Sequence, residues 1–206
     1  MLTLLTPKFY FFMTTIDLTK WRFIGGGSER KCYQNPNDPT RLIKLSPKKS
    51  AKQTLREIAY FQYLIDHNVP FDHIPRFYGA IKEEQFIGIE QELILASPKS
   101  TEPAPNIGQY ISKKLSKDQI IELHRALIQL KDYLIRWHIV LCDLQISNIV
   151  IQRKEKGIHL MLIDGLGGTE LIPLSRWFIS ICHKKTNKYW KKLCRKITRA
   201  NPDIIF

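Results

Sequence analysis

Hydrophobic and polar residues alternate in short runs over the first half of the chain and follow a helical period in much of the second half. Residues 20–46, KWRFIGGGSERKCYQNPNDPTRLIKLS, predict a strand, a glycine turn, a strand, a Pro/Asn turn and a strand. Residues 50–67 instead place apolar side chains three and four positions apart, which predicts a helix with Ser50 as its N-cap. Residues 68–81 and 85–94 predict a helix break followed by further strands.

A polar, Pro-rich segment at residues 96–106 separates these elements from the clearest helix, residues 116–140, which opens with a Ser116/Gln119 capping box. Two apolar runs predict a hairpin over residues 148–164, and the chain from Leu171 is expected to be mostly helical. Strands early and helices late predict an α+β fold. We divide the chain into a poorly ordered extension at 1–15, an N-terminal lobe at 16–96 and a C-terminal lobe at 97–206.

Net charge is the feature of the composition that limits the possible functions of the protein. Lysine and arginine number 32 against 19 acidic residues, a formal net charge of +13 in 206 residues. This balance favours polyanionic partners such as phosphates or an anionic membrane surface. Nucleic acid is not expected, because no nucleic-acid-binding motif is present. The hydrophobic share of 44% excludes a globally disordered chain.

Targeting signals and cysteines bear on location. The first 13 residues, MLTLLTPKFYFFM, contain a short apolar run broken by Pro7 and Lys8. Neither a signal peptide nor a transmembrane helix is expected from it, and Met13 is an alternative start to Met1. The four cysteines show no metal-ligand spacing, and scattered thiols are typical of a reducing cytoplasm, so we expect a cytoplasmic protein.

Three features of the first half are candidates for binding an anion. Gly25, Gly26 and Gly27 stand between two predicted strands, where backbone N–H groups can approach a phosphate; a plain hairpin turn is the alternative. Lys44 lies inside the apolar strand RLIKL and either needs a charged partner or faces water at a sheet edge. Glu57 is the candidate partner because it lies near the apolar face of the predicted helix; the alternative is a solvated helix glutamate.

Three polar residues of the second half are candidates for a metal site. Asp143 and Asn148 are five positions apart, between the long helix and a strand, and Asp164 follows the next strand and precedes Gly165. A hard cation needs oxygen ligands, which Asn148 and Asp164 supply. A helix stop followed by an Asp-Gly turn is the alternative.

Taken together, these residues resemble the protein-kinase-like superfamily. The chain resembles more narrowly the bacterial YrbL family, described as PhoP regulatory network proteins. The resemblance covers about residues 25–190 and rests on GGGSERKCY, RLIKL, IPRFYG, the Asp143–Asn148 segment, LIDGLGG and ELIPLSRW.

The resemblance implies a compact, protein-kinase-like two-lobed fold, with a small N-terminal antiparallel sheet plus one helix and a mostly helical C-terminal lobe. It implies ATP and Mg²⁺ as cofactors. Gly25 to Gly27 would cover the nucleotide phosphates, Lys44 would pair with Glu57, and the adenine would lie near EQELI at 90–94. Asp143 would be the catalytic base or orienting group, with Asn148 and Asp164 on the metal.

The chain also departs from the kinase pattern. Arg30 replaces the third loop glycine, Leu141 and Cys142 stand at the His-Arg positions, and Gln145 stands where many kinases carry a lysine that contacts the transferring phosphate. Gly165 and Leu166 replace the Phe-Gly pair after the metal-binding aspartate, and no A-P-E motif follows. These departures leave open an atypical kinase with an unknown, non-protein acceptor, or a nucleotide-binding pseudokinase with a regulatory role.

Every charged residue between Glu170 and Asp203 is a lysine or an arginine. Helical apolar spacing through Tyr189, Leu193 and Ile197 predicts a basic amphipathic helix. A helix docked on the core with a solvated lysine face is one interpretation. An anion-facing surface for lipid headgroups or lipopolysaccharide-like phosphates is the other, and it supports a third hypothesis, a basic polyanion-binding interaction protein.

Overall fold

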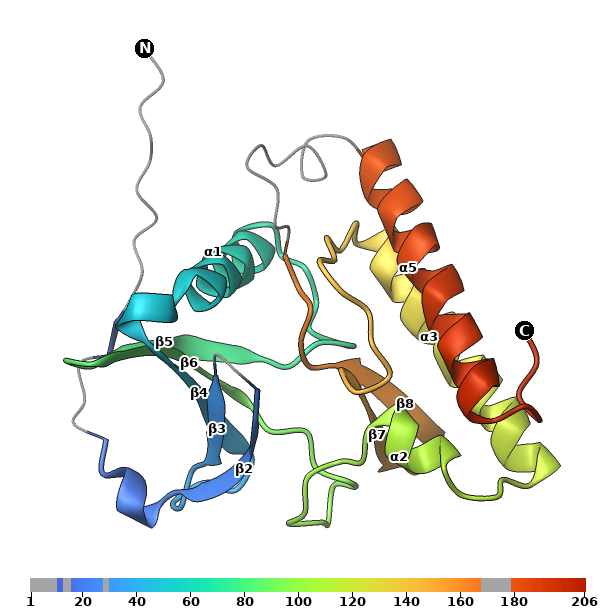
Figure 1. Ribbon diagram of the computed structural model, residues 1–206, viewed down its shortest axis with the longest axis horizontal. Helices are drawn as coiled ribbons and strands as arrows, with labels where there is room; N and C mark the ends of the chain where they lie inside the picture. Colours follow the sequence, from blue (N-terminus) through green and yellow to red (C-terminus); the bar gives the residue numbers. More distant parts are fainter. Residues whose placement is uncertain (1–10, 13–15, 28–29, 168–178) are drawn as a thin grey trace. The chain divides into compact units, whose positions relative to one another are not determined.

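The computed structural model describes residues 11–12, 16–27, 30–167 and 179–206 (Figure 1). They divide into two compact units. Unit 1 contains residues up to Pro70 together with Arg76–Leu93, and unit 2 contains Phe71–Pro75 together with Ile94–Phe206.

Unit 1 contains a six-stranded sheet with strand order β1-β5-β6-β4-β3-β2. The strands are β1 (Phe11–Phe12), β2 (Arg22–Gly26), β3 (Lys31–Gln34), β4 (Arg41–Pro47), β5 (Phe77–Lys82) and β6 (Phe86–Glu92). Neighbouring strands pair antiparallel, except that β1 runs parallel to β5. The strands predicted around the glycine turn and the Pro/Asn turn are therefore confirmed.

Helix α1 (Lys52–Asp66) lies along the sheet in Figure 1 and contacts β6. Its buried residues recur at helical spacing and are Thr54, Glu57, Ile58, Tyr60, Phe61 and Leu64. The hydroxyl groups of Ser46 on β4 and Thr54 on α1 are hydrogen bonded at 2.7 Å. On the same strand, Ile43 and Leu45 form a separate cluster with Ile81. The two faces of β4 therefore meet different surroundings.

The predicted N-cap at Ser50 is wrong. Ser50 ends a short 3₁₀ turn, η2 (Lys48–Ser50), which follows directly on β4. The N-cap of α1 is Ala51, which makes no side-chain hydrogen bond to the first turn. Because η2 runs straight into α1, Ser50 does not have the extended backbone that a capping serine needs. Its hydroxyl instead donates to the Pro47 carbonyl at 3.4 Å.

The described residues of unit 2 form helices and a hairpin. These elements are α2 (Ile107–Ile111), α3 (Lys117–Arg136), β7 (Ile149–Lys154), β8 (Gly157–Leu162) and α5 (Ile179–Ala200). The capping box of Ser116 and Gln119 is confirmed at the start of α3, and β7 and β8 form the predicted hairpin. The prediction of helix from Leu171 is confirmed for α5, and residues 171–178 lie outside the described part of the chain.

Helices α3 and α5 run side by side in opposite directions (Figure 1). Near the start of α5, the Cys182 thiol donates to the Ile139 carbonyl, just beyond the end of α3. Further along, the Lys131 ammonium lies 5.9 Å from the centre of the Trp190 ring. The buried stripe of α5 comprises Cys182, Thr186, Trp190, Leu193 and Ile197, and it fixes the helix in unit 2.

The segment Phe71–Pro75 belongs to unit 2 although unit 1 precedes and follows it in the sequence. The Leu162 amide donates to the His73 carbonyl at 2.8 Å, and His73 Nδ1 donates to the Leu160 carbonyl at 2.7 Å. The His73 and His159 rings stack with their centres 4.4 Å apart. Burial lowers the pKa of both histidines, because it disfavours the charged imidazole. The segment is thus held against the hairpin by β8.

The α+β class is confirmed by the sheet of unit 1 and the helices of unit 2. Across the described helices, none combines the length and apolar character that crossing a bilayer requires.

Candidate functional site

Lys44 and Glu57 form a buried ion pair in unit 1. Lys44 lies in the middle of β4 with 5% of its surface exposed, and Glu57 lies on the buried face of α1 with 3% exposed. Lys44 Nζ is 3.5 Å from Glu57 Oε1. Because successive strand residues point to opposite faces, Lys44 faces α1 while Ile43 and Leu45 face away from it. The fold therefore brings these two candidate residues together.

Arg30 is a second cation on the same carboxylate. Its Nη1 bonds Glu57 Oε2, the oxygen opposite the one that faces Lys44. Arg30 directly precedes β3 and is 7% exposed. In the sequence Arg30 is visible only as a departure from the glycine pattern, so this contact was missed. Glu57 is thereby paired with two cationic side chains, one near each oxygen.

The three candidate glycines end the β2–β3 hairpin. Gly26 lies opposite Lys31, and the Gly27 amide donates to the Arg30 carbonyl at 2.9 Å. A Cβ atom on Gly26 would lie 2.6 Å from that carbonyl oxygen, so the close approach of the backbone requires glycine. Gly27 has no atom within 4 Å of such a Cβ position. The described residues on either side form the paired strands β2 and β3, and phosphate binding by Gly25 to Gly27 stays a prediction.

Asp143 lies on a loop of unit 2 that is held against Gly165. The Cys142 amide donates to the Gly165 carbonyl at 2.9 Å, and Leu141 forms a β-bridge with Leu166. Gly165 has a φ of +85°, and a Cβ atom there would lie 2.2 Å from the Asp143 carbonyl oxygen. Only glycine fits both conditions. Gly165 therefore allows the backbone that follows Asp164 to approach the backbone of Asp143.

The β7–β8 hairpin places Asn148 beside Asp164. The last residue pair of the ladder is Ile149 with Leu162, and beyond it the Ile163 amide donates to the Asn148 carbonyl at 2.8 Å. Asp164 follows directly, and its Oδ1 accepts a hydrogen bond from the Gly165 amide at 2.7 Å. Asn148 and Asp164 are both half-buried. Asp143, Asn148 and Asp164 thus gather at one end of the hairpin.

Gln145 connects Asp143 to the C-terminal helix. Its Nε2 donates to Asp143 Oδ1 at 2.8 Å, and the Leu144 amide donates to the same oxygen at 2.9 Å. Gln145 Oε1 accepts a hydrogen bond from Lys196 Nζ on α5. In the sequence, Gln145 stands out only as a departure from the kinase pattern, and Lys196 is one of many basic residues. Neither contact was predicted.

The side-chain oxygens of this end of the hairpin match one class of metal. Within the described residues, no group of three or more His, Cys, Asp and Glu side chains is arranged to hold a metal ion. The candidate donors are the carboxylates of Asp143 and Asp164 and the amide of Asn148. Mg²⁺ is typically bound by one or two carboxylates and completes its ligands with water and substrate phosphates, whereas structural zinc takes Cys and His. The donors therefore fit Mg²⁺.

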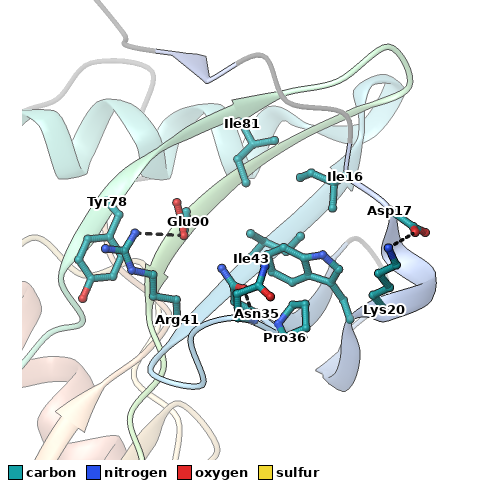
Figure 2. A pocket seen from close by; sticks show the side chains of 12 residues that line it. Ile16, Asp17, Lys20, Asn35, Pro36, Arg41, Ile43, Tyr78, Ile81 and Glu90 are labelled. Carbon is teal, nitrogen blue, oxygen red and sulfur yellow. Dashed lines mark hydrogen bonds and ion pairs between the residues drawn. The ribbon is translucent and has the colours of Figure 1, made fainter.

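A cavity of about 640 Å³ lies elsewhere in unit 1 (Figure 2). Its walls include Arg41, Ile43, Tyr78 and Glu90. The Arg41 guanidinium contacts Glu90 at 3.4 Å and lies 4.1 Å from the centre of the Tyr78 ring. Ile43 points away from the side of β4 that carries Lys44, so the cavity lies on the other face of the sheet. It is therefore separate from the ion pair with Glu57.

Comparisons with known proteins identify relatives over most of the chain. The model of the family "PhoP regulatory network protein YrbL" matches residues 16–198. The YrbL protein of Escherichia coli (strain K12) is 28% identical over 181 residues, which cover 86% of this chain and 85% of that protein. The YrbL protein of Shigella flexneri matches with the same identity and coverage.

Proposed function

The chain belongs to the YrbL family of PhoP regulatory network proteins, and from that premise we propose that it is a small kinase-like protein. It binds Mg·ATP and transfers a phosphoryl group to a non-protein acceptor. The observation that carries the proposal is the buried ion pair of a strand lysine, Lys44, with a helix glutamate, Glu57. Protein kinases use such a pair to hold the ATP phosphates.

In this proposal unit 1 supplies the phosphate-binding cation. Lys44 holds nucleotide phosphates, and Glu57 holds Lys44 in place. Arg30 on the second oxygen of Glu57 keeps the carboxylate in one orientation. A buried, fixed ammonium interacts more strongly with a phosphate than a mobile surface lysine does, because little solvent screens it and little side-chain freedom is lost.

Unit 2 supplies the metal ligands and the acceptor-binding carboxylate. Asn148 and Asp164 would hold Mg²⁺, which neutralises phosphate charge when it is bound. Asp143 would accept a hydrogen bond from the acceptor hydroxyl and orient it. The bonds that Gln145 and the Leu144 amide donate to Asp143 Oδ1 fix the carboxylate for this role. Transfer then depends on positioning and charge, which is how phosphoryl transfer is generally catalysed.

The sequence between Asp164 and α5 supports the proposal of a non-protein acceptor. No A-P-E motif occurs there, and the chain has few residues to form a docking surface for a protein substrate. The same departures favour, as the variant of this proposal, a nucleotide-binding pseudokinase that acts in the PhoP network without transferring phosphate.

The test compares Mg·ATP binding with turnover. Isothermal titration with Mg·ATP should show binding to the wild type that is lost in Lys44→Met and in Asp164→Asn. Asp132→Asn is the matched control, because Asp132 is an exposed aspartate on α3. Release of ADP by the wild type, abolished in Asp143→Ala, supports the kinase. Binding without turnover supports the pseudokinase, and no Mg·ATP binding by the wild type excludes both.

The basic face of α5 favours a second candidate, a polyanion-binding protein. Lys184, Lys188 and Lys191 are exposed and lie on the side of α5 opposite its buried stripe. Their replacement by glutamate should abolish co-sedimentation with vesicles that contain anionic lipid, if this surface binds them. Vesicle binding that is unchanged by these substitutions and by salt would exclude this candidate.

A further inference from the structure

A lysine of the C-terminal helix reaches the loop that carries Asp143. Lys196 Nζ donates to Gln145 Oε1, and Gln145 Nε2 donates to Asp143 Oδ1 at 2.8 Å. The Gln145 amide has one donor end and one acceptor end. Because its donor end faces Asp143, its acceptor end turns to Lys196. The relay therefore brings a positive charge to the neighbourhood of the Asp143 carboxylate.

The position of Lys196 on α5 is fixed by its neighbours. Leu193 and Ile197 are fully buried and anchor this turn of the helix. At 100° per residue, Lys196 lies at the border between this buried stripe and the basic face. Lys192, one turn earlier, is exposed. The anchored backbone and the long side chain allow Lys196 to remain exposed while its ammonium group reaches Gln145.

The chemistry of this arrangement suits a phosphate. A lysine ammonium has three N–H donors, and the bond to Gln145 uses one of them. A phosphoryl oxygen is a charged acceptor and forms a stronger hydrogen bond with an ammonium than a neutral amide oxygen does. We propose that Lys196 binds the terminal phosphoryl group of the nucleotide beside Asp143. The C-terminal helix thereby contributes a substrate-binding residue to the site, an inference that rests on the proposed function.

The experiment measures the preference for ATP over ADP. Dissociation constants of Mg·ATP and Mg·ADP are determined by isothermal titration for the wild type, Lys196→Gln and Lys192→Gln. If Lys196 contacts the terminal phosphoryl group, Lys196→Gln should weaken Mg·ATP binding about tenfold or more and leave Mg·ADP within roughly twofold, because a charge-assisted hydrogen bond is lost with ATP alone.

Lys192→Gln is the matched control. It removes the same charge from the same helix one turn away, and it should leave both dissociation constants within about twofold, because charge at this exposed position is screened. Lys196→Arg keeps the charge and should keep most of the ATP preference. Circular dichroism and thermal unfolding of each variant confirm that the fold is retained.

A charge-relocation variant gives an independent readout. Gln145→Lys combined with Lys196→Gln exchanges the two side chains that meet in the relay. This double variant should recover at least part of the ATP preference that Lys196→Gln alone loses, because the positive charge returns to the same place. A structural role of Lys196 in holding α5 instead predicts that Lys196→Gln weakens Mg·ATP and Mg·ADP binding equally.

The outcomes separate this inference from the proposed function. If the wild type binds Mg·ATP and Lys196→Gln leaves both dissociation constants unchanged, or weakens ATP and ADP equally, Lys196 does not contact the terminal phosphoryl group and the proposed function stands. If the wild type binds neither nucleotide, both proposals fail.

Discussion

Replacing Glu57 by leucine removes the carboxylate that both Arg30 and Lys44 contact, and we expect it to destabilise the protein by about 3–5 kcal/mol. The three side chains are 4–7% exposed, so water solvates them poorly. At the 3.5 Å between Lys44 Nζ and Glu57 Oε1, opposite charges attract by roughly 5 kcal/mol in an effective dielectric of about 20. Removing Glu57 leaves two buried cations without this compensation.

The assay is urea unfolding followed by tryptophan fluorescence and circular dichroism, together with thermal unfolding. In a chain of this size the expected loss corresponds to a fall in Tm of roughly 6–20 °C. Lys44→Met should be less harmful than Glu57→Leu, because Arg30 still contacts Glu57. Arg153→Gln breaks the more exposed ion pair with Glu122 and should change the free energy of unfolding by at most about 1 kcal/mol.

Two results would refute the reasoning. If Glu57→Leu loses no more stability than Arg153→Gln, the buried carboxylate does not compensate its neighbours. If Lys44→Met is as harmful as Glu57→Leu, Arg30 does not hold Glu57 when the lysine is absent. In the expected case, Lys44→Met remains folded and is a valid variant for the nucleotide-binding test.

Three further substitutions test features of the fold. Burial lowers the pKa of His73 below its ordinary value of 6.5. As the pH falls through that value, the unfolded chain therefore binds more protons than the folded protein does, and the free energy of unfolding declines. His73→Asn should flatten the decline of the urea midpoint between about pH 7 and pH 5. Gly165→Ala should destabilise the protein by more than 1 kcal/mol in urea unfolding, because φ is positive and the Asp143 carbonyl occupies the position of the added Cβ atom. Gly27→Ala should be tolerated, because no atom lies near the corresponding Cβ position. Ser116→Ala removes the N-cap of α3 and should lower the free energy of unfolding by about 1 kcal/mol in the same assay, and an unchanged midpoint would contradict the capping role.

The elements that could be predicted carry their signals locally. The capping box at Ser116 spans four residues, and the period of apolar side chains identified the strands and the long helix. Helix α2 was missed although it begins with a capping box of Asn106 and Gln109, because the prolines just before it indicated a connection instead. The capping box was a local signal for the helix, but the neighbouring prolines outweighed it in the prediction.

The contacts that could not be predicted join distant residues. Arg30 and Glu57 are 27 positions apart, and Gln145 and Lys196 are 51 positions apart. No periodicity marks such pairs, because their proximity depends on how strands and helices pack. The Lys44–Glu57 pair was anticipated because a lysine within an apolar strand needs an opposite charge and Glu57 lies near the apolar face of the predicted helix.

The segment Phe71–Pro75, which belongs to unit 2 but lies within the sequence of unit 1, has a consequence for dividing the protein into fragments. A fragment that starts at Ile94 contains the helices described in unit 2 but lacks the His73 carbonyl that accepts a hydrogen bond from the Leu162 amide. Its β8 edge would then be open to pairing with other chains. We expect such a fragment to self-associate, and addition of a synthetic peptide that spans residues 71–75 should counteract this. A fragment in which residues 71–75 are linked to Ile94 keeps this strip of backbone and is the more suitable way to obtain unit 2 in isolation.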